Sequence, residues 1–448
     1  MGIAMSDRSG ARWLRYLPKP LRSRLEGRQA LHAVIGNSGW LLFDKLIRAA
    51  LGLLVGVWVA RYLGPTRFGE LAYVLAFIAF FQAVANLGAD GIIVREIARD
   101  RFAASRILGT ALVLRFCVGV ACWTGAIAVM ALVNGVNDPS VVLTALAGGV
   151  LVFQAADTVD LWFQSQSQSR RTVVAKLIAY LLSNGAKVVL ILADAPLAAF
   201  AAITALESAA GALGLYLAYR RFPTSGRWEM ILKQGWQLLR ESWPFMMSGV
   251  SIMVYIRIDQ IMIKEMLGEK ELGLYAAALP LSQVWQVIPV VLATSLAPVI
   301  ARKKAEGESE YQDALLAIFR IFGALSLCVS VTTALASSTL ILVLYGQSYS
   351  DATSILAIHA FSNIFVFQGV AQSLWLINEQ AGSLSLIKTI LGGIAAVGAN
   401  LILLPIFGTV GAAIAAIVSI GIASVFSNIL YAPRIFLMQL GIRPREQR

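Results

Sequence analysis

Charged side chains interrupt several long apolar stretches of this sequence. In the run 243–267, Arg257 and Asp259 lie two residues apart. That spacing is about 200° around a helix, so they are not a natural pair and each needs its own partner. A charge near the centre of a membrane-spanning helix costs on the order of 2.5–3.5 kcal/mol. Side chains retained at that cost are expected to line a polar cavity or to pair with other charges.

Basic residues on four expected helices are candidates for a cavity that binds an anionic ligand. Arg and Lys suit this role because Arg makes bidentate contacts with phosphate or carboxylate and Lys supplies a mobile point charge. Arg115 fits equally well at the membrane surface, where a long basic side chain can reach water. The same alternative holds, less strongly, for Arg48 and Lys187. The candidates are Arg48, Arg115, Lys187 and Arg257.

Lys187 belongs to a polar stripe in the run 172–194. Lys176 and Lys187 are eleven residues apart, close to three helical turns, so they share a face. Tyr180, Ser183 and Asn184 lie between them. A stripe this long predicts contact with water or with another helix rather than with lipid, although Lys176 alone could reach the membrane surface.

The acidic residues within apolar runs are candidates for coupling or ion pairing. Asp44 and Arg48 are one turn apart and can pair within their helix. Asp157 and Asp160 share a face, and they suit either a proton or sodium site or partners for basic residues on another helix. Glu207, alone in its run, is expected to pair with a base on a neighbouring helix, and Asp259 to anchor to another helix while Arg257 faces the cavity.

The composition predicts a polytopic membrane protein. The chain has 448 residues, of which 58% are hydrophobic and 14% charged, and its mean hydropathy is +0.73. A soluble domain has about 25% charged residues. A span needs about 20 apolar residues, and the runs number twelve, six on each side of a polar linker. They cover 37–63, 69–93, 107–133, 140–164, 172–194, 196–219, 243–267, 272–300, 314–345, 352–377, 383–406 and 409–432.

Basic residues predict the orientation of these helices. They gather in a segment at 1–36, in the linker 220–242 and in a tail at 433–448, and also in alternate connections between helices. The positive-inside rule therefore places both termini and the linker in the cytoplasm. The formal net charge of +12 follows from this topology, so nucleic acid is not an expected partner. The two expected bundles are residues 37–219 and 243–432.

A faint repeat relates the two halves. "YLGPTRFGELAYVLA" at 62–76 aligns without gaps with "MLGEKELGLYAAALP" at 266–280, pairing Gly64 with Gly268 and Gly69 with Gly273. Both segments join the first and second helix of a half. Because each half has an even number of helices, the halves point the same way, which predicts a pseudo-two-fold axis along the membrane normal.

The segments "ARYLGPTRFGELAYVLAFIAFFQAVANLGADGIIVREIARD" (60–100) and "YIRIDQIMIKEMLGEKELGLYAAA" (255–278) resemble Wzx-type polysaccharide repeat-unit flippases of the multidrug/oligosaccharidyl-lipid/polysaccharide (MOP) exporter superfamily. The resemblance implies a V-shaped transporter in the bacterial inner membrane, without catalytic residues. It implies alternating access through a cationic central cavity. The cargo would be undecaprenyl-pyrophosphate-linked oligosaccharide, moved to the periplasmic leaflet for exopolysaccharide or O-antigen assembly. Polymerase and chain-length proteins of the same pathway are implied partners.

Other activities are less well supported by the sequence. It contains no phosphate-binding G-x-x-x-x-G-K-[ST] motif, and no nucleophilic or zinc constellation, so we expect no enzyme activity and no cofactor. A proton or sodium gradient could drive transport. The alternatives are a drug/cation antiporter, which would favour an acidic cavity, and a membrane polymerase, which usually has a large periplasmic loop. In the second half, His359, Asn378, Lys388 and Asn400 fit helix packing better than function.

Overall fold

The computed structural model describes residues 29–224 and 226–443, with side chains described from residue 43, and the expected segment 1–36 lies largely outside this part. Within the described part every regular element is helical. The first half contains α2 (Gln29–Ala85), α3 (Asp90–Arg99), α4 (Ala104–Asn134), α5 (Pro139–Ala147), α6 (Val150–Phe153), α7 (Thr158–Ser165), α8 (Arg170–Leu192) and α9 (Leu197–Arg221).

The second half repeats this all-helical plan. Its helices are α10 (Leu232–Leu267), α11 (Glu269–Gln283), α12 (Val287–Glu306), α13 (Glu308–Leu344), α14 (Ala352–His359), α15 (Ser362–Asn378), α16 (Gly382–Gly421), α17 (Asn428–Tyr431) and α18 (Pro433–Gln439). A π-helical turn, Ile422–Phe426, continues α16. Short 3₁₀ turns join α6 to α7 and α11 to α12, so single membrane crossings are built from two or three shorter helices.

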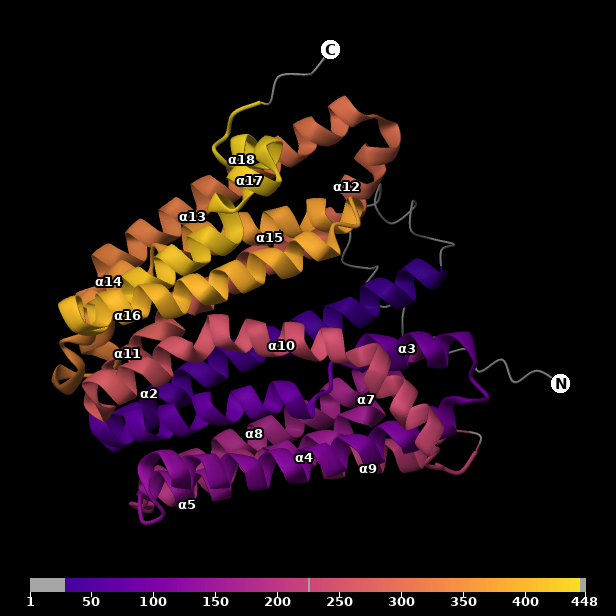
Figure 1. The fold of residues 1–448 in the computed structure, drawn as a ribbon, viewed down its shortest axis with the longest axis horizontal. Coiled ribbons are helices and arrows are strands. Elements are labelled where there is room, and N and C mark those ends of the chain that lie inside the picture. Colours follow the sequence, from indigo (N-terminus) through magenta and orange to yellow (C-terminus); the bar gives the residue numbers. More distant parts are fainter. Residues whose placement is uncertain (1–28, 225, 444–448) are drawn as a thin grey trace.

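Ten helical segments in the described part are long and apolar enough to cross a membrane. Two of them double back on themselves. Gly64 in α2 and Gly408 in α16 have non-helical dihedrals, with φ of 72° and 59°, and Figure 1 shows the ribbon reversing direction in both helices. Counting each arm of these two segments separately gives the twelve crossings that the sequence predicts.

The repeated glycines are the point where the two halves touch most closely. A Cβ atom on Gly69 would lie 1.8 Å from the carbonyl oxygen of Glu269, and one on Gly273 would lie 1.8 Å from that of Pro65. These residues are equivalent in the repeat, with the same offset of 204 as Gly64 and Gly268. The contact is therefore reciprocal, as expected where a two-fold axis passes between two copies of a surface.

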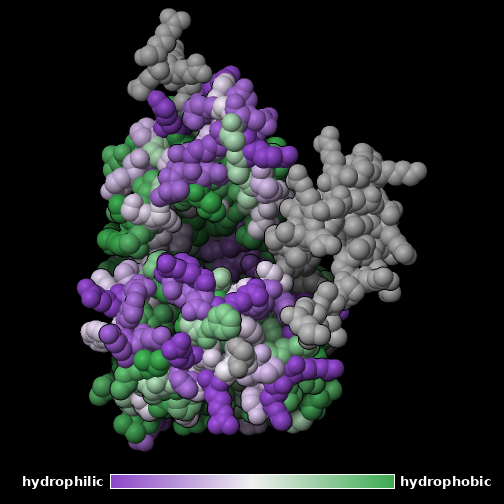
Figure 2. Space-filling view, turned by 90° about the vertical axis from the view of Figure 1, so that its right-hand side faces the viewer, coloured by the Kyte–Doolittle hydropathy of each residue, from purple (hydrophilic) through white to green (hydrophobic). Residues whose placement is uncertain are grey.

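The halves meet at one end of the molecule and separate toward the other. In Figure 1 they join where α2 and α11 lie side by side and diverge toward α3 and α12. One apolar core at the joined end combines residues from both halves, including Leu63, Tyr275 and Tyr349. Figure 2, seen from the separated end, shows a hollow between the halves with hydrophilic residues around its rim. We call the end where the halves join the closed end, and the end where they separate the open end.

The polar linker packs against the first half at the open end. The Ile231 amide donates to the Thr110 hydroxyl over 3.1 Å, and the Trp228 indole donates to the Tyr219 hydroxyl over 2.6 Å. α10 begins at Leu232 rather than at the expected 243, because Leu238 and Leu239 continue the apolar core formed by α3 and α4. The polar composition of this stretch reflects an exposed face rather than a loop.

Candidate functional site

A polar cavity of about 330 Å³ lies in the first half. Its walls come from the second arm of α2, from α4, from the 3₁₀ turn Gln154–Asp157 with α7, and from α8. Met253 of α10 closes one side. Two cations and three carboxylates line it, namely Arg115, Lys176, Asp90, Asp157 and Asp160. This concentration of charge sits inside helices that are apolar enough to cross a membrane.

Arg115 is fully buried in the wall of this cavity. Its guanidinium pairs with the carboxylate of Asp90 and donates to the Asn86 carbonyl over 3.3 Å, while its Nε has no hydrogen-bond partner in the described part of the chain. Of its two expected positions, the structure places Arg115 in a cavity wall. Asp90 was not among the residues expected from the sequence, although an acidic residue in the first turn of a helix is a recognisable signal.

Lys176 lies between two carboxylates. Its ammonium is 2.8 Å from Asp157 and 3.0 Å from Asp160, so α8 is tied to α7 and to the 3₁₀ turn that precedes it. A 3₁₀ break within a crossing brings Asp157 to this position. One lysine balances only one of the two aspartates, which leaves the cavity with one more carboxylate than cations.

Asp44 and Arg48 form the intrahelical pair that their spacing permits, at 2.8 Å. The guanidinium of Arg48 also lies 4.7 Å from the centre of the Tyr180 ring, and the Tyr180 hydroxyl donates to the Arg48 carbonyl over 2.9 Å. Gly52, one turn further along, leaves room for that hydroxyl. Arg48 is therefore committed to packing α2 against α8.

Lys187 and Glu207 face each other across α8 and α9, with 3.9 Å between their charged atoms. Both side chains are about a quarter exposed. This gives Glu207 a basic neighbour on another helix. Lys187 is not among the residues that line the cavity of the first half.

The side chains of Arg257 and Asp259 leave α10 in different directions, yet the Arg257 charge is close enough to act on Asp259 and on Tyr275. Asp259 accepts a 2.5 Å hydrogen bond from the Tyr275 hydroxyl of α11 and another from the Gln260 amide, and it lines a cavity of the second half. Arg257 shares its face with Met253, one turn earlier, which lines the cavity of the first half. Among the described residues Arg257 has no ion pair, unlike Arg48, Arg115 and Lys187.

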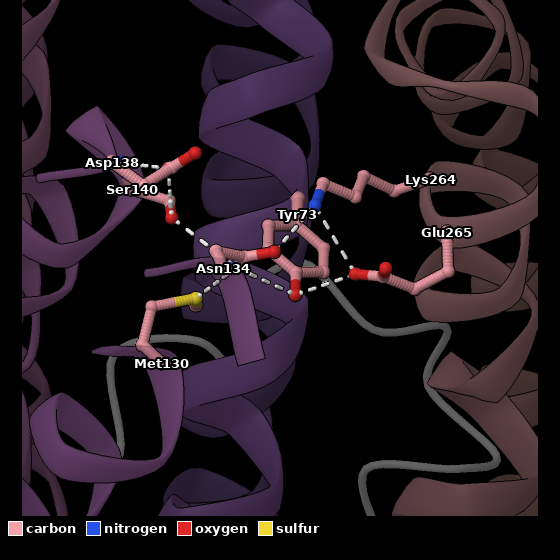
Figure 3. A network of polar contacts seen from close by, with 7 residues as sticks. All are labelled: Tyr73, Met130, Asn134, Asp138, Ser140, Lys264 and Glu265. Carbon is pink, nitrogen blue, oxygen red and sulfur yellow. Dashed lines mark hydrogen bonds and ion pairs between the residues drawn. The ribbon is translucent and has the colours of Figure 1, made fainter. Parts of the chain in front are cut away.

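A polar network ties the halves together at the closed end (Figure 3). The Tyr73 hydroxyl of α2 donates to Glu265 of α10 over 2.9 Å, and Lys264 donates to the Asn134 side-chain oxygen of α4 over 2.8 Å. The Asn134 amide in turn donates to the Tyr73 hydroxyl and to Ser140. We call Tyr73, Asn134, Lys264 and Glu265 the closed-end network. It must break before the halves can separate at this end.

The second half contains a larger cavity, of about 630 Å³. Lys388 and Asn400 of α16 line it, both nearly inaccessible to solvent. Sequence analysis assigned these two residues to helix packing, since isolated polar residues in apolar helices give no sign of a shared cavity. In the described residues, no group of three or more His, Cys, Asp or Glu side chains is placed to bind a metal ion.

Comparison with solved structures defines the class of this fold. It matches an inward-facing multidrug resistance MATE family transporter of the MOP superfamily with a TM-score of 0.69, at 18% identity over 89% of this chain and 96% of that one. It also matches the lipid II flippase MurJ in an inward closed conformation, with a TM-score of 0.67 at 13% identity over 91% and 90%. A MOP transporter from Pyrococcus furiosus, described as having a binding pocket of reversed polarity, matches with a TM-score of 0.62 at 18% identity over 91% and 96%.

The fold is therefore that of these MOP-superfamily transporters, which are multi-pass membrane proteins. A family model described as "Polysaccharide biosynthesis protein" matches residues 34–304, more than half of the chain. This chain belongs to that family, which confirms the resemblance and the all-helical twelve-crossing fold expected from the sequence. No curated protein matched it.

Proposed function

We propose that this protein is a flippase for undecaprenyl-pyrophosphate-linked oligosaccharides, moving repeat units from the cytoplasmic to the periplasmic leaflet of the bacterial inner membrane. The observation that carries the proposal is Arg257. No ion pair within 4 Å is formed by its guanidinium in the described part of the chain, and it lies one helical turn from Met253, which lines the charged cavity of the first half. Family membership supports a role in polysaccharide assembly, with polymerase and chain-length proteins as partners.

The chemistry of the cargo explains why such a residue is retained. The lipid tail can stay in the bilayer, whereas the pyrophosphate and sugars need a polar route. A guanidinium forms paired, charge-assisted hydrogen bonds with phosphate oxygens. Arg257 makes no ion pair within 4 Å among the described residues, although its charge acts on Asp259 and Tyr275. Arg48, Arg115 and Lys187 are instead paired with Asp44, Asp90 and Glu207. The cationic character of the route therefore rests on Arg257 more than on a general excess of basic residues.

Transport would proceed by alternating access. The open end carries the basic connections and so corresponds to the cytoplasm. Release on the other side requires the closed-end network and the contact between Gly69 and Gly273 to separate. We assign the unbalanced carboxylate of the Asp157–Lys176–Asp160 group to coupling with a proton or sodium gradient.

Reconstituted transport tests the assignment of Arg257. In vesicles carrying fluorescent undecaprenyl-pyrophosphate oligosaccharide, wild-type protein should expose the sugar to an added glycosidase. Arg257→Ala should lower the rate at least tenfold, since a hydrogen bond to a charged group is worth about 1.5–3 kcal/mol. Arg257→Lys should retain part of the rate. Arg227→Ala, an equal charge loss at an exposed position, serves as the control.

One observation favours a second candidate, a cation antiporter. The cavity of the first half holds three carboxylates and two cations, a balance that suits a cationic ligand. The vesicle experiment separates the two. Uptake of a cationic dye driven by a proton or sodium gradient, together with no sugar flipping by wild-type protein above the level of protein-free vesicles, would replace the flippase assignment with the antiporter.

A further inference from the structure

The cavity of the second half, which we call the slot, is lined by α10, α11, α12, α15 and α16. The α16 residues that line it include Ser385, Thr389, Ala396 and Asn400, whose spacing of four, seven and four places them on one helical face. From Ser385 to Asn400 that face runs about 22 Å along the helix axis. About half of the lining side chains carry hydrogen-bonding groups. The surface they present to the cavity is nevertheless mainly apolar, so the polar groups stand at separate points along it.

Lys388 places an amine in this slot without a matching anion. Its amine contacts three oxygens, those of the Gln372 side chain, the Asn428 side chain at 2.9 Å and the Ser424 carbonyl at 3.3 Å. All three acceptors are neutral, and in the part of the chain that the structure describes Lys388 forms no ion pair. Only 4% of Lys388 is exposed. A buried charge is costly unless it is paired, so an anion entering the slot would be stabilised there.

The carboxylate of Asp259 lines the same slot but does not supply that anion. The ring of Tyr255 lies against Gly392, one turn beyond Lys388, and Asp259 is one turn beyond Tyr255 on α10. Because both helices run from the open to the closed end, Lys388 and Asp259 are about 12 Å apart along the axis. Asp259 is held by Tyr275. His359 also lines this region, with its ring bonded to the Ser282 hydroxyl.

Another polar atom that lines the slot, the side-chain oxygen of Asn400, lacks a hydrogen-bond donor among the described residues. The side-chain amide of Asn400 donates to the Ala396 carbonyl over 2.8 Å, but its oxygen is buried and has no hydrogen-bond donor among the described residues. Asn400 is 1% exposed. A buried acceptor left unpaired costs about 1–3 kcal/mol. A hydroxyl group of a ligand would satisfy it, as a sugar in the slot could.

We propose that this slot is a saccharide-binding site that prefers an acidic sugar, with Lys388 as the partner of the sugar carboxylate and Asn400 as an acceptor for a hydroxyl. The inference rests on the proposed flippase function, because it places part of the oligosaccharide in the second half. It makes the slot a determinant of which repeat units are carried, separate from Arg257.

Two disaccharides that differ only in a carboxyl group test this site. Purified full-length protein in nanodiscs of neutral lipid would be titrated with cellobiouronic acid and with cellobiose, and binding followed by saturation-transfer NMR. Wild-type protein should bind the acidic sugar about tenfold more tightly, the worth of one charge-assisted contact. Equal binding of the two sugars by wild-type protein, or binding of neither, would overturn the proposal.

Variants locate the preference within the slot. Lys388→Gln should bind both sugars equally, and Lys388→Arg should keep the preference. Lys303→Gln, the same change at an exposed helix end, should also keep it. Asn400→Leu should weaken the binding of both sugars by the same factor. This variant also tests the slot if Lys388→Gln does not fold. An unchanged preference in folded Lys388→Gln would refute the role of Lys388.

The outcome is independent of the vesicle experiment. Sugar flipping by wild-type protein without an acidic preference would leave the flippase in place and remove the site. A preference that depends on Lys388 in a protein that flips no lipid-linked sugar would keep the site and remove the flippase.

Discussion

Arg115 and Asp90 form one ion pair, yet their surroundings differ. The Arg115 side chain is 2% exposed and the Asp90 side chain 50% exposed. If the pair is broken, water can therefore solvate the Asp90 carboxylate. The buried Arg115 guanidinium cannot be solvated in this way. A buried charge left unpaired is far more costly than the loss of the pair itself. The same reasoning explains why Asp90 belongs to the site although it lies at its rim.

Stability measurements should reveal this asymmetry. Asp90→Asn should destabilise the protein by on the order of 3 kcal/mol, because Arg115 stays buried without an anion. Arg115→Met should cost clearly less, and the double variant should recover most of the loss in Asp90→Asn. Thermal unfolding in detergent would rank the three variants by stability. Equal losses in the two single variants would show that Arg115 is hydrated despite its burial.

Residue identity and spacing predicted less of the site than of the fold. The Asp44–Arg48 pair follows from spacing alone, because both residues lie on one helix. The partners of Lys176, Asp90 and Lys388 lie on other helices, distant in the sequence. Helical periodicity predicts the direction of a side chain around its own helix, but not which neighbouring helix it meets. Arg115 shows the limit clearly, since the same position in its run fits the surface and the interior equally well.

At the scale of helices, the second arm of α2 and α11 cross with their backbones in contact. Only glycine permits this at positions 69 and 273, since a Cβ at either would overlap a carbonyl oxygen of the other half. The sequence predicted the repeat and its position in each half, but not that the repeated glycines face each other. Symmetry of position along the chain does not by itself reveal the surface through which two copies pair.

A single methyl group at this crossing should force the helices apart. Gly69→Ala and Gly273→Ala should each destabilise the protein by roughly 1–3 kcal/mol, the usual cost of overpacking. Gly56→Ala is the matched control, because a Cβ there meets nothing within 4 Å and alanine favours the helix. Unfolding curves of the three variants would measure these changes in stability. If Gly69→Ala left the stability unchanged, the two helices would not be in contact in the membrane.

At the scale of the whole molecule, the two halves share one apolar core at the closed end. At the open end one core lies within the second half, and another joins α3 and α4 to the start of α10. Movement that opens one end must therefore disrupt the shared core and the closed-end network. The network stabilises the closed end through directional hydrogen bonds, whereas the core stabilises it through buried apolar surface. A change confined to one hydrogen bond of the network should shift the balance between conformations without unfolding either half.

Tyr73→Phe should shift the population away from the conformation that is closed at the network end. The substitution removes the hydrogen bond to Glu265 while the ring keeps its packing, at a cost of about 1 kcal/mol to the closed end. Spin labels at Phe102 and Lys303, one on each half at the open end, would report shorter distances in more molecules. Tyr216→Phe, on the exposed surface of α9, is the control, and identical distance distributions in both variants would argue against a latching role.

The reciprocal contact between Gly69 and Gly273 also bears on how such a protein could arise. A six-helix chain ends on the side of the membrane where it began, so two copies joined in tandem lie parallel. Each copy would offer the other the same glycine and the same carbonyl, so one mutation would create both contacts at once. Joining the copies through a segment like 220–242 preserves this pairing and frees each half to diverge. Lys388 in one half and Arg115 in the other show how far the two have since specialised.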